Sequence, residues 1–326
     1  MRIVFMGTPD FSVPCLQTLI DDGHDVCAVF TQPDKPKGRH GVLTPPPVKE
    51  LALKYDIPVY QPKTLKTDEA KELFKSLNAD LAIVVAYGKI LPGEFIHAPK
   101  YGCINMHASL LPKLRGAAPI QWSIITGEKR TGVTSMQMDE GLDTGDMLIS
   151  KSVEIGENET AEELHDRLSS LGSEVMRETI AALQAGNLHP VKQDNEKSTY
   201  APILTKELSK IDWNDTAQHI HDKIRGLYSW PGASGELDGK VIKIHSSRLA
   251  GACSGKPGEI IESGKRLVVS CGDGNAVEIL VLQDLYPYGL WRRYHHRGAC
   301  SLGNGLRRKQ RRLYRKDKQQ SVLPGV

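Results

Sequence analysis

The sequence predicts an α/β domain with a mostly parallel sheet, followed by a small β-barrel domain. The length of 326 residues favours two domains, because single hydrophobic cores stop growing near about 250 to 300 residues. Short β-rich runs alternate with helical patterns in the first half, which is typical of βαβ units. The second half places Asp-Gly turns between alternating runs, which indicates hairpins.

The first domain opens with five elements in strand-helix alternation. We expect strands at residues 3–6, 26–30 and 81–86 and helices at residues 13–20 and 48–55. This order predicts right-handed crossovers on a parallel sheet. The first turn, GTPD, has one glycine where a dinucleotide site has G-x-G-x-x-G, so a nicotinamide cofactor is disfavoured.

A long helix closes the first domain. It begins at Thr160, whose hydroxyl can form a capping box with the Glu163 carboxylate, and it continues to Gly186. Residues 187–206 are polar, proline-punctuated and aperiodic, which is typical of a linker. The first domain is therefore expected over residues 1–186.

The second domain is expected over residues 207–283. A short amphipathic helix at residues 217–224 precedes the runs GELDGKVIKIHS and RLVVSCGDGNAVEILVLQ. Both runs carry the Asp-Gly turn between alternating strands, which is the hairpin chemistry of a small barrel.

Composition excludes several classes of protein. With 40% hydrophobic and 25% charged residues, the chain has no apolar segment of membrane-spanning length, and its opening MRIVFMG lacks the apolar core of a signal peptide. We therefore expect a cytoplasmic monomer without membrane contact. The six cysteines show no C-x-x-C spacing and the histidines no H-E-x-x-H, so neither disulfides nor a metal are expected.

A candidate catalytic set lies near the end of a buried strand at residues 104–107. Asn105 and His107 are two residues apart and project from the same face of that strand. Asp143 lies in a Gly-rich loop that can carry a carboxylate toward a cleft. Together these side chains can catalyse acyl transfer to an amine: the amide and a protonated imidazole stabilise the oxyanion, and the carboxylate keeps the histidine cationic.

Plainer interpretations stand beside this one. A single strand histidine is more often a structural residue with satisfied hydrogen bonds, and an aspartate among glycines is a turn residue by default. The combination at one loop-bearing edge of an α/β sheet, where ligands tend to bind, favours catalysis.

Several longer stretches make the sequence resemble the methionyl-tRNA formyltransferase family, over about residues 1–282. The stretches are IVFMGTPDF, VVAYGKILP, NMHASLLPKLRGAAPIQW, MDEGLDTGDM and YSWPGA. The SLLP-x-x-R-G segment is a specific mark of the wider superfamily of 10-formyltetrahydrofolate-dependent formyltransferases. The resemblance implies a Rossmann-like formyltransferase domain followed by an OB-like barrel that binds tRNA.

The resemblance also implies an activity and its residues. The family transfers the formyl group of 10-formyltetrahydrofolate to the α-amino group of methionyl initiator tRNA, for translation initiation, and needs no metal. Asn105, His107 and Asp143 match its catalytic triad. Its tetrahydrofolate-binding loop is matched by four consecutive residues: Ser109, Leu110, Leu111 and Pro112.

An insertion at residues 31–49 is rich in Pro, Gly and basic residues, as a mobile surface loop would be. The basic residues Lys35, Lys37, Arg39 and Lys49 can bind phosphates. Composition alone favours an ordinary solvated loop, but the resemblance implies a loop that enters the acceptor arm of the tRNA, with Arg39 as its important arginine. In the barrel, further candidates for phosphate attraction are Lys206, Lys210, Lys223, Arg225, Lys240, Lys243 and Arg248.

The sequence leaves two rival functions open. A formyltransferase for a free amine, such as a nucleotide sugar or glycinamide ribonucleotide, would share the triad and the SLLP loop, but the basic insertion and the barrel argue against it. A non-catalytic RNA-binding protein would not need Asn105, His107 and Asp143.

The C-terminal residues 284–326 leave the family pattern abruptly. Residues 283–326 hold eleven Lys and Arg against two Asp, a balance of +9, which leaves −6 for the rest of a chain of net charge +3. The tail can be an added arm for RNA phosphates, or the product of a reading-frame change near codon 284, which the abruptness favours. We expect a loosely held tail and a barrel that lacks its normal closing segment.

Overall fold

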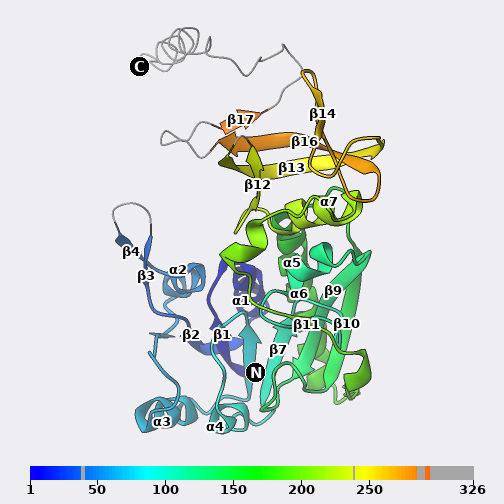
Figure 1. Ribbon diagram of the computed structural model, residues 1–326. Coiled ribbons are helices and arrows are strands. Elements are labelled where there is room, and N and C mark those ends of the chain that lie inside the picture. Colours follow the sequence, from blue (N-terminus) through cyan, green and yellow to red (C-terminus); the bar gives the residue numbers. More distant parts are fainter. Residues whose placement is uncertain (38–40, 238, 285–290, 294–326) are drawn as a thin grey trace, which may run out of the picture.

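The computed structural model describes residues 1–37, 41–237, 239–284 and 291–293. Figure 1 shows an α/β unit below and a unit of strands above, with helix α7 (Ala217–Gly226) between them. The expected α/β domain with a mostly parallel sheet, followed by a small β domain, is confirmed. Most of the tail (residues 285–290 and 294–326), residue 238 and the centre of the basic insertion, residues 38–40, lie outside the described residues.

The sheet of the first unit has the strand order β10-β9-β7-β6-β1-β2-β5. Its parallel strands are β1 (Arg2–Gly7), β2 (Asp25–Phe30), β5 (Val59–Tyr60), β6 (Leu81–Val85) and β7 (Cys103–His107). Strand β9 (Arg130–Gln137) is antiparallel to β7, and β10 (Met147–Glu154) is antiparallel to β9. The carboxyl ends of the parallel strands thus share one edge, where ligands of α/β proteins bind.

Helices cover both faces of this sheet, so its central strands are buried on both sides. On β1, Ile3 and Phe5 join the cluster under one group of helices, and Val4 and Met6 the cluster under the other. Burying one such side chain contributes roughly 1.5–3 kcal/mol. The first group comprises α1 (Val13–Asp21), α2 (Pro47–Lys54), α5 (Pro119–Ile125) and α6 (Ala161–Gln184), and the second α3 (Asp68–Ser76) and α4 (Gly93–Ile96).

The long helix α6 begins where the sequence predicts. Thr160 accepts a hydrogen bond from the backbone of Glu163 at 3.3 Å, and the Glu163 carboxylate accepts from the backbone of Thr160 at 2.9 Å. This reciprocal box satisfies two backbone donors that a helix N-terminus leaves without partners.

The basic insertion differs from the expected loop. It forms a hairpin of β3 (Lys35–Lys37) and β4 (Val42–Thr44), and α2 then begins at Pro47. Two three-residue strands, one of them Lys-Pro-Lys, are too short to show alternation in the sequence.

Short 3₁₀ helices lie at η1 (Asp10–Ser12), η2 (Asn195–Lys197) and η3 (Lys206–Ser209).

The second unit is an antiparallel sheet of order β12-β13-β16-β15-β14, with β17 paired to β16. The described pairings do not join β12 to β14, the two ends of this order. Ile220 and Ile224 of α7 pack with Ile244 and Val277 in its core. The strands are β12 (Ala233–Leu237), β13 (Lys240–Ala252), β14 (Ile260–Ser263), β15 (Leu267–Ser270), β16 (Asn275–Asp284) and β17 (Trp291–Arg293).

Helix α7 also joins the two units, and it packs closely against α5. A Cβ added at Gly226 would lie 2.7 Å from a side-chain carbon of Ile125 and 3.2 Å from the carbonyl oxygen of Gln121, so glycine permits the close approach. Arg225 donates hydrogen bonds to the carbonyl oxygens of Gly156 and Glu159, just before α6. These contacts fix the β unit against the sheet-bearing unit.

No helix within the described ranges combines the length and the apolar character that crossing a membrane requires.

Candidate active site

Asn105 and His107 lie at the carboxyl end of β7 and project from the same face, as period two predicts. The opposite face carries Ile104 and Met106 into the core. His107 is 6% exposed, whereas Asn105 is half-buried and its amide makes no hydrogen bond to the described part of the chain. Asn105 can therefore use its amide for a ligand.

The His107 ring has two distinct partners. Its Nε2 lies 2.9 Å from the carbonyl oxygen of Leu114, and its Nδ1 lies 3.8 Å from Oδ2 of Asp143. Because a carbonyl oxygen only accepts, Nε2 carries a hydrogen in this arrangement. The neutral ring then gains a further proton at Nδ1, beside the carboxylate, and the protonated ring gives it up there.

Asp143 stands at the tip of the loop between β9 and β10. Its φ of 52° lies in the left-handed region, which a non-glycine residue rarely adopts. Oδ2 accepts a hydrogen bond of 2.8 Å from the backbone N–H of Gly116, in the short strand β8 (Arg115–Gly116). Leu114 also has a positive φ, of 58°. Backbone strain of this kind often concentrates at functional sites.

The predicted folate loop, residues 109–112, follows β7 as a bend. The hydroxyl of Thr134 donates to the carbonyl oxygen of Ser109 at 2.8 Å and accepts from the N–H of Leu111 at 3.3 Å. Ser109 is fully buried, and its own hydroxyl donates to the carbonyl oxygen of Lys113 at 2.6 Å. Ser109 thus shapes the loop, while Leu110 and Pro112 are its half-exposed members.

Two groups of the site cannot be predicted from side-chain types. The carbonyl of Leu114 and the N–H of Gly116 hold His107 and Asp143, yet both are backbone groups that any residue provides. The only signal in the sequence is that both positions fall inside the SLLPKLRG stretch.

The predicted tRNA-binding residues have different outcomes. Lys35 is exposed on β3, whereas the side chain of Lys37 and the whole of Arg39 lie outside the described residues. The expectation for Lys49 is wrong: its Nζ lies 2.9 Å from the Asp34 carboxylate and 2.8 Å from Oε1 of Gln61. The charge of Lys49 is therefore paired within the protein.

Among the basic candidates of the β unit, Arg225 is also a correction. It is 5% exposed and pairs with buried Asp222 at 2.7 Å, so it cannot meet a phosphate. Arg248 pairs with Glu278 at 2.8 Å. By contrast, Lys206 and Lys210 are exposed.

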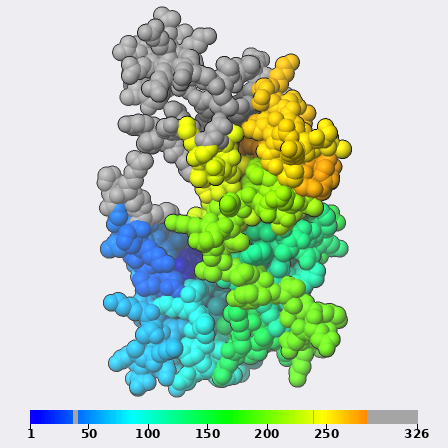
Figure 2. All heavy atoms as spheres, viewed as in Figure 1, coloured from blue at the N-terminus to red at the C-terminus, as the bar shows by residue number. Residues whose placement is uncertain are grey.

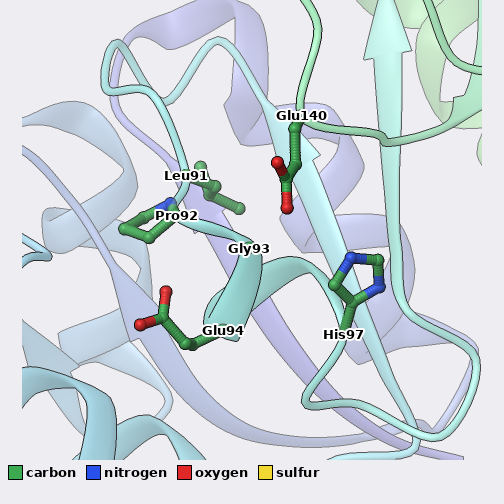
Figure 3. A pocket seen from close by; sticks show the side chains of 6 residues that line it. All are labelled: Leu91, Pro92, Gly93, Glu94, His97 and Glu140. Atoms are coloured by element: carbon green, nitrogen blue, oxygen red, sulfur yellow. The ribbon is translucent and has the colours of Figure 1, made fainter.

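A pocket of about 510 Å³ lies beside the Asp143 loop and is lined by Leu91, Pro92, Gly93, Glu94, His97 and Glu140. Figure 3 shows the Glu140 carboxylate turned toward Gly93 and His97. Glu94 pairs with Lys71 at 2.7 Å, and this hydrogen bond lowers the pKa of Glu94. The lining does not include Asn105, His107 or Asp143, so this pocket does not contain the candidate catalytic residues.

The described ranges bring no three His, Cys, Asp or Glu side chains together in a way that could hold a metal ion. The chemistry that the triad supports is acyl transfer: an amide donor, an imidazole with one free ring nitrogen, and a carboxylate beside that nitrogen.

Two family models match the chain. The one described as Formyl transferase matches residues 1–180, and the one described as Formyl transferase, C-terminal domain, matches residues 203–285.

Curated relatives match over most of their length. The methionyl-tRNA formyltransferase of Caldanaerobacter subterraneus subsp. tengcongensis is 52% identical over 285 residues, which are 87% of this chain and 92% of the relative. The protein of the same name from Geobacter metallireducens is 52% identical, and the match covers 84% of this chain and 88% of the relative. The one from Bacillus subtilis is 49% identical, and the match covers 88% of this chain and 90% of the relative.

Solved structures share the fold at lower identity. An N-formyltransferase of Helicobacter canadensis, in complex with folinic acid and dTDP-3-aminofucose, matches with a TM-score of 0.69 at 22% identity and covers 86% of this chain and 98% of that one. HypX of Aquifex aeolicus, in complex with tetrahydrofolic acid, matches with a TM-score of 0.60 at 20% identity, over 90% of this chain and 46% of that one. At these identities the likeness concerns the fold alone.

Proposed function

The chain belongs to the methionyl-tRNA formyltransferase family, and from this membership we propose that Asn105, His107 and Asp143 perform its formyl transfer. The reaction moves the formyl group of 10-formyltetrahydrofolate to the α-amino group of methionyl initiator tRNA. The observation that carries the assignment of residues is the 3.8 Å approach of Asp143 to Nδ1 of His107, at the carboxyl edge of the sheet.

The reaction forms one C–N bond and breaks another. The α-amino nitrogen attacks the formyl carbon, the carbonyl oxygen becomes negative, and the bond to N10 of the folate then breaks. Asn105 donates its amide hydrogens to the developing oxyanion, and protonated His107 stabilises the same charge. The proton that the amine loses passes through the His107 and Asp143 pair to N10, so no side chain is acylated.

The Leu114 carbonyl gives this mechanism a defined tautomer. With Nε2–H donating to that carbonyl, the mobile proton is at Nδ1, within 3.8 Å of the Asp143 carboxylate. The protonated ring is the form that can polarise a carbonyl. Residues 109–112 would hold 10-formyltetrahydrofolate beside this nitrogen, and the mechanism uses no metal.

The tRNA would approach between the basic hairpin and the β unit. Figure 2 shows the blue surface around the hairpin and the green-to-yellow surface of the second unit on either side of an indentation. Lys35 on one side and Lys206 and Lys210 on the other are exposed and can attract phosphates. The family resemblance implies that Lys37 and Arg39 also contact the tRNA.

Two rivals have less support. The solved sugar N-formyltransferases share the fold at about one fifth sequence identity, whereas the relatives near 50% identity bear the tRNA enzyme's name. A non-catalytic RNA-binding protein would not require a buried histidine aligned on a carboxylate. A cytoplasmic monomer remains our expectation for a translation enzyme.

The test is an acceptor assay with 10-formyltetrahydrofolate as donor. Purified protein should formylate methionyl initiator tRNA and should not formylate a dTDP-amino sugar or glycinamide ribonucleotide at comparable rates. Transfer to a small amine without transfer to tRNA would overturn the proposal, and transfer to no acceptor would favour the non-catalytic rival.

A further inference from the structure

The segment at residues 187–206, which connects the two units, contacts the backbone of Leu114 and of Asp143, the two residues beside the His107 ring. We propose that Gln193 and Thr199 in this segment are positioning residues for the formyl transfer, an inference that rests on the proposed function. They touch neither reacting atoms nor His107 itself, and they act through the Leu114 carbonyl and the Asp143 carboxylate.

Thr199 holds the peptide groups on both sides of Leu114. Its hydroxyl accepts from the N–H of Leu114 at 2.9 Å, and its carbonyl oxygen accepts from the N–H of Arg115 at 2.9 Å. The N–H of Arg115 belongs to the same planar peptide as the carbonyl of Leu114, and in a trans peptide the two groups point in opposite directions. Binding this N–H to Thr199 therefore directs the carbonyl toward Nε2 of His107, which lies 2.9 Å away.

Leu114 needs such support because its φ of 58° costs conformational energy for a residue with a Cβ. If the hydroxyl of Thr199 were lost, Leu114 could relax toward an ordinary conformation and turn its carbonyl away from His107. The tautomer of the ring would then no longer be fixed by its surroundings.

Gln193 holds the other partner of His107. Its Nε2 donates to the carbonyl oxygen of Asp143 at 2.8 Å and to that of Gly145 at 2.7 Å. These bonds bracket Thr144 and fix the loop in which Asp143 has its positive φ. The segment is anchored nearby by Val191, whose backbone exchanges hydrogen bonds of 2.8 and 2.9 Å with Met147.

Arg115 joins the two contacts. Its Nε donates to Oε1 of Gln193 at 2.9 Å, while its backbone N–H is bound to Thr199. The side-chain amide of Gln193 is thus bonded at both its oxygen and its nitrogen. Both sides of the His107 ring are consequently held by one segment, and that segment also carries the β unit.

The experiment measures formylation of initiator methionyl-tRNA by the parent and by three variants. Thr199→Val and Gln193→Ala remove the two side-chain contacts, and Thr199→Ser keeps the hydroxyl. Thr199 is exposed, so valine should preserve the fold while removing the acceptor for Leu114. We expect kcat to fall about 10- to 100-fold in the valine and alanine variants, because a misplaced catalytic group costs about this much. The KM for 10-formyltetrahydrofolate and the Tm should change little, and Thr199→Ser should restore most of the rate.

Ser198→Ala is the matched control, since the Ser198 hydroxyl donates to the carbonyl of Asn195 and not to the triad; it should retain the parent rate. A second comparison repeats Thr199→Val in a His107→Ala background. There the valine should have almost no further effect, because residues that act as a unit are non-additive.

A parent-like kcat in Thr199→Val and Gln193→Ala would overturn the inference. So would an undiminished loss in the His107→Ala background, because the effect would then not pass through His107. Failure of the proposed function gives a different result, namely a parent protein that does not formylate the tRNA.

Discussion

The environment of His107 explains how a single residue type can serve either structure or catalysis. A structural histidine would have both ring nitrogens bonded to the protein, as His221 does with Ser247 and the carbonyl of Glu157. Within the described part of the chain, His107 instead has one hydrogen bond, to Leu114, and the Asp143 carboxylate lies 3.8 Å from its other nitrogen. One nitrogen is fixed and the other is available for proton movement.

The first prediction concerns His107→Ala. In the proposed mechanism the ring supplies the mobile proton, so kcat for initiator methionyl-tRNA should fall about 10²- to 10⁴-fold, the usual effect of removing a positioned acid or base. His189→Ala, at an exposed position, is the control and should keep the parent kcat. Activity of His107→Ala within about threefold of the parent, with an unchanged Tm, would remove His107 from the mechanism.

At this scale the sequence predicts side chains well and their partners poorly. Period two places Asn105 and His107 on one face, and the glycine-rich loop indicates Asp143. Counting charges cannot distinguish a free cation from a paired one, which is why the expectations for Lys49 and Arg225 are wrong. The pairing of both residues, and the burial of Arg225, depend on tertiary contacts that no local pattern encodes.

At the scale of elements, α7 connects stability to pH. Burial lowers the pKa of His221 below its ordinary 6.5, against the opposing effect of its bond to the Glu157 carbonyl. The buried pair of Arg225 and Asp222 lies on the same helix, and Arg225 lowers this pKa while Asp222 raises it. The folded protein therefore prefers His221 uncharged.

The second prediction follows from the sign of this shift. Well above pH 6.5 the ring is neutral in both folded and unfolded chains, so the full stability is present. As the pH falls below 6.5 toward the lower folded pKa, the unfolded chain binds the proton first and stability is lost. The Tm of the parent should drop more steeply between pH 7.5 and 5.5 than that of His221→Gln.

His24 and His245 also have pKa values lowered by burial, and both remain in the variant. The difference between the two Tm profiles therefore isolates His221. Parallel profiles for parent and His221→Gln would show that this histidine does not link folding to pH.

Long periodic elements are predicted from the sequence, and short ones are not. The apolar spacing and the capping box indicate α6 to within two residues at each end. The sequence does not predict the three-residue strands β3 and β4. It also does not predict β11 (Tyr200–Ala201), which lies inside the segment expected as a linker and pairs with β8. Their pairing is set by distant partners, so an aperiodic sequence can still be firmly bonded.

At the scale of the whole molecule, the two units are held together by α7, which lies between them (Figure 1), and by residues 187–206. In the proposed function, the exposed lysines of the hairpin and of the β unit bind the same tRNA. Recognition of a large substrate would thus depend on both units, while the chemistry stays at β7. Of the tail, Trp291–Arg293 pairs with β16 as β17, whereas residues 285–290 and 294–326 lie outside the described ranges, so the loosely held tail stays a prediction.

The third prediction concerns Arg39→Ala. If Arg39 contacts tRNA, the kcat/KM for initiator methionyl-tRNA should fall about tenfold or more, since one charged hydrogen bond contributes about 1.5–3 kcal/mol. The KM for 10-formyltetrahydrofolate should stay unchanged. Lys54→Ala, an exposed lysine of α2 beyond the hairpin, is the control. An unchanged kcat/KM for tRNA in Arg39→Ala would exclude this contact.

The most direct test of the central claim is the ratio of kcat/KM values for formylation of methionyl initiator tRNA and methionyl elongator tRNA. Both acceptors carry the same aminoacyl group, so the ratio reports what the protein reads in the tRNA itself. A translation-initiation formyltransferase should prefer the initiator by at least about 100-fold, a difference of about 2.7 kcal/mol in transition-state binding. Equal values for the two tRNAs, or a higher value for a free amino sugar, would contradict the account.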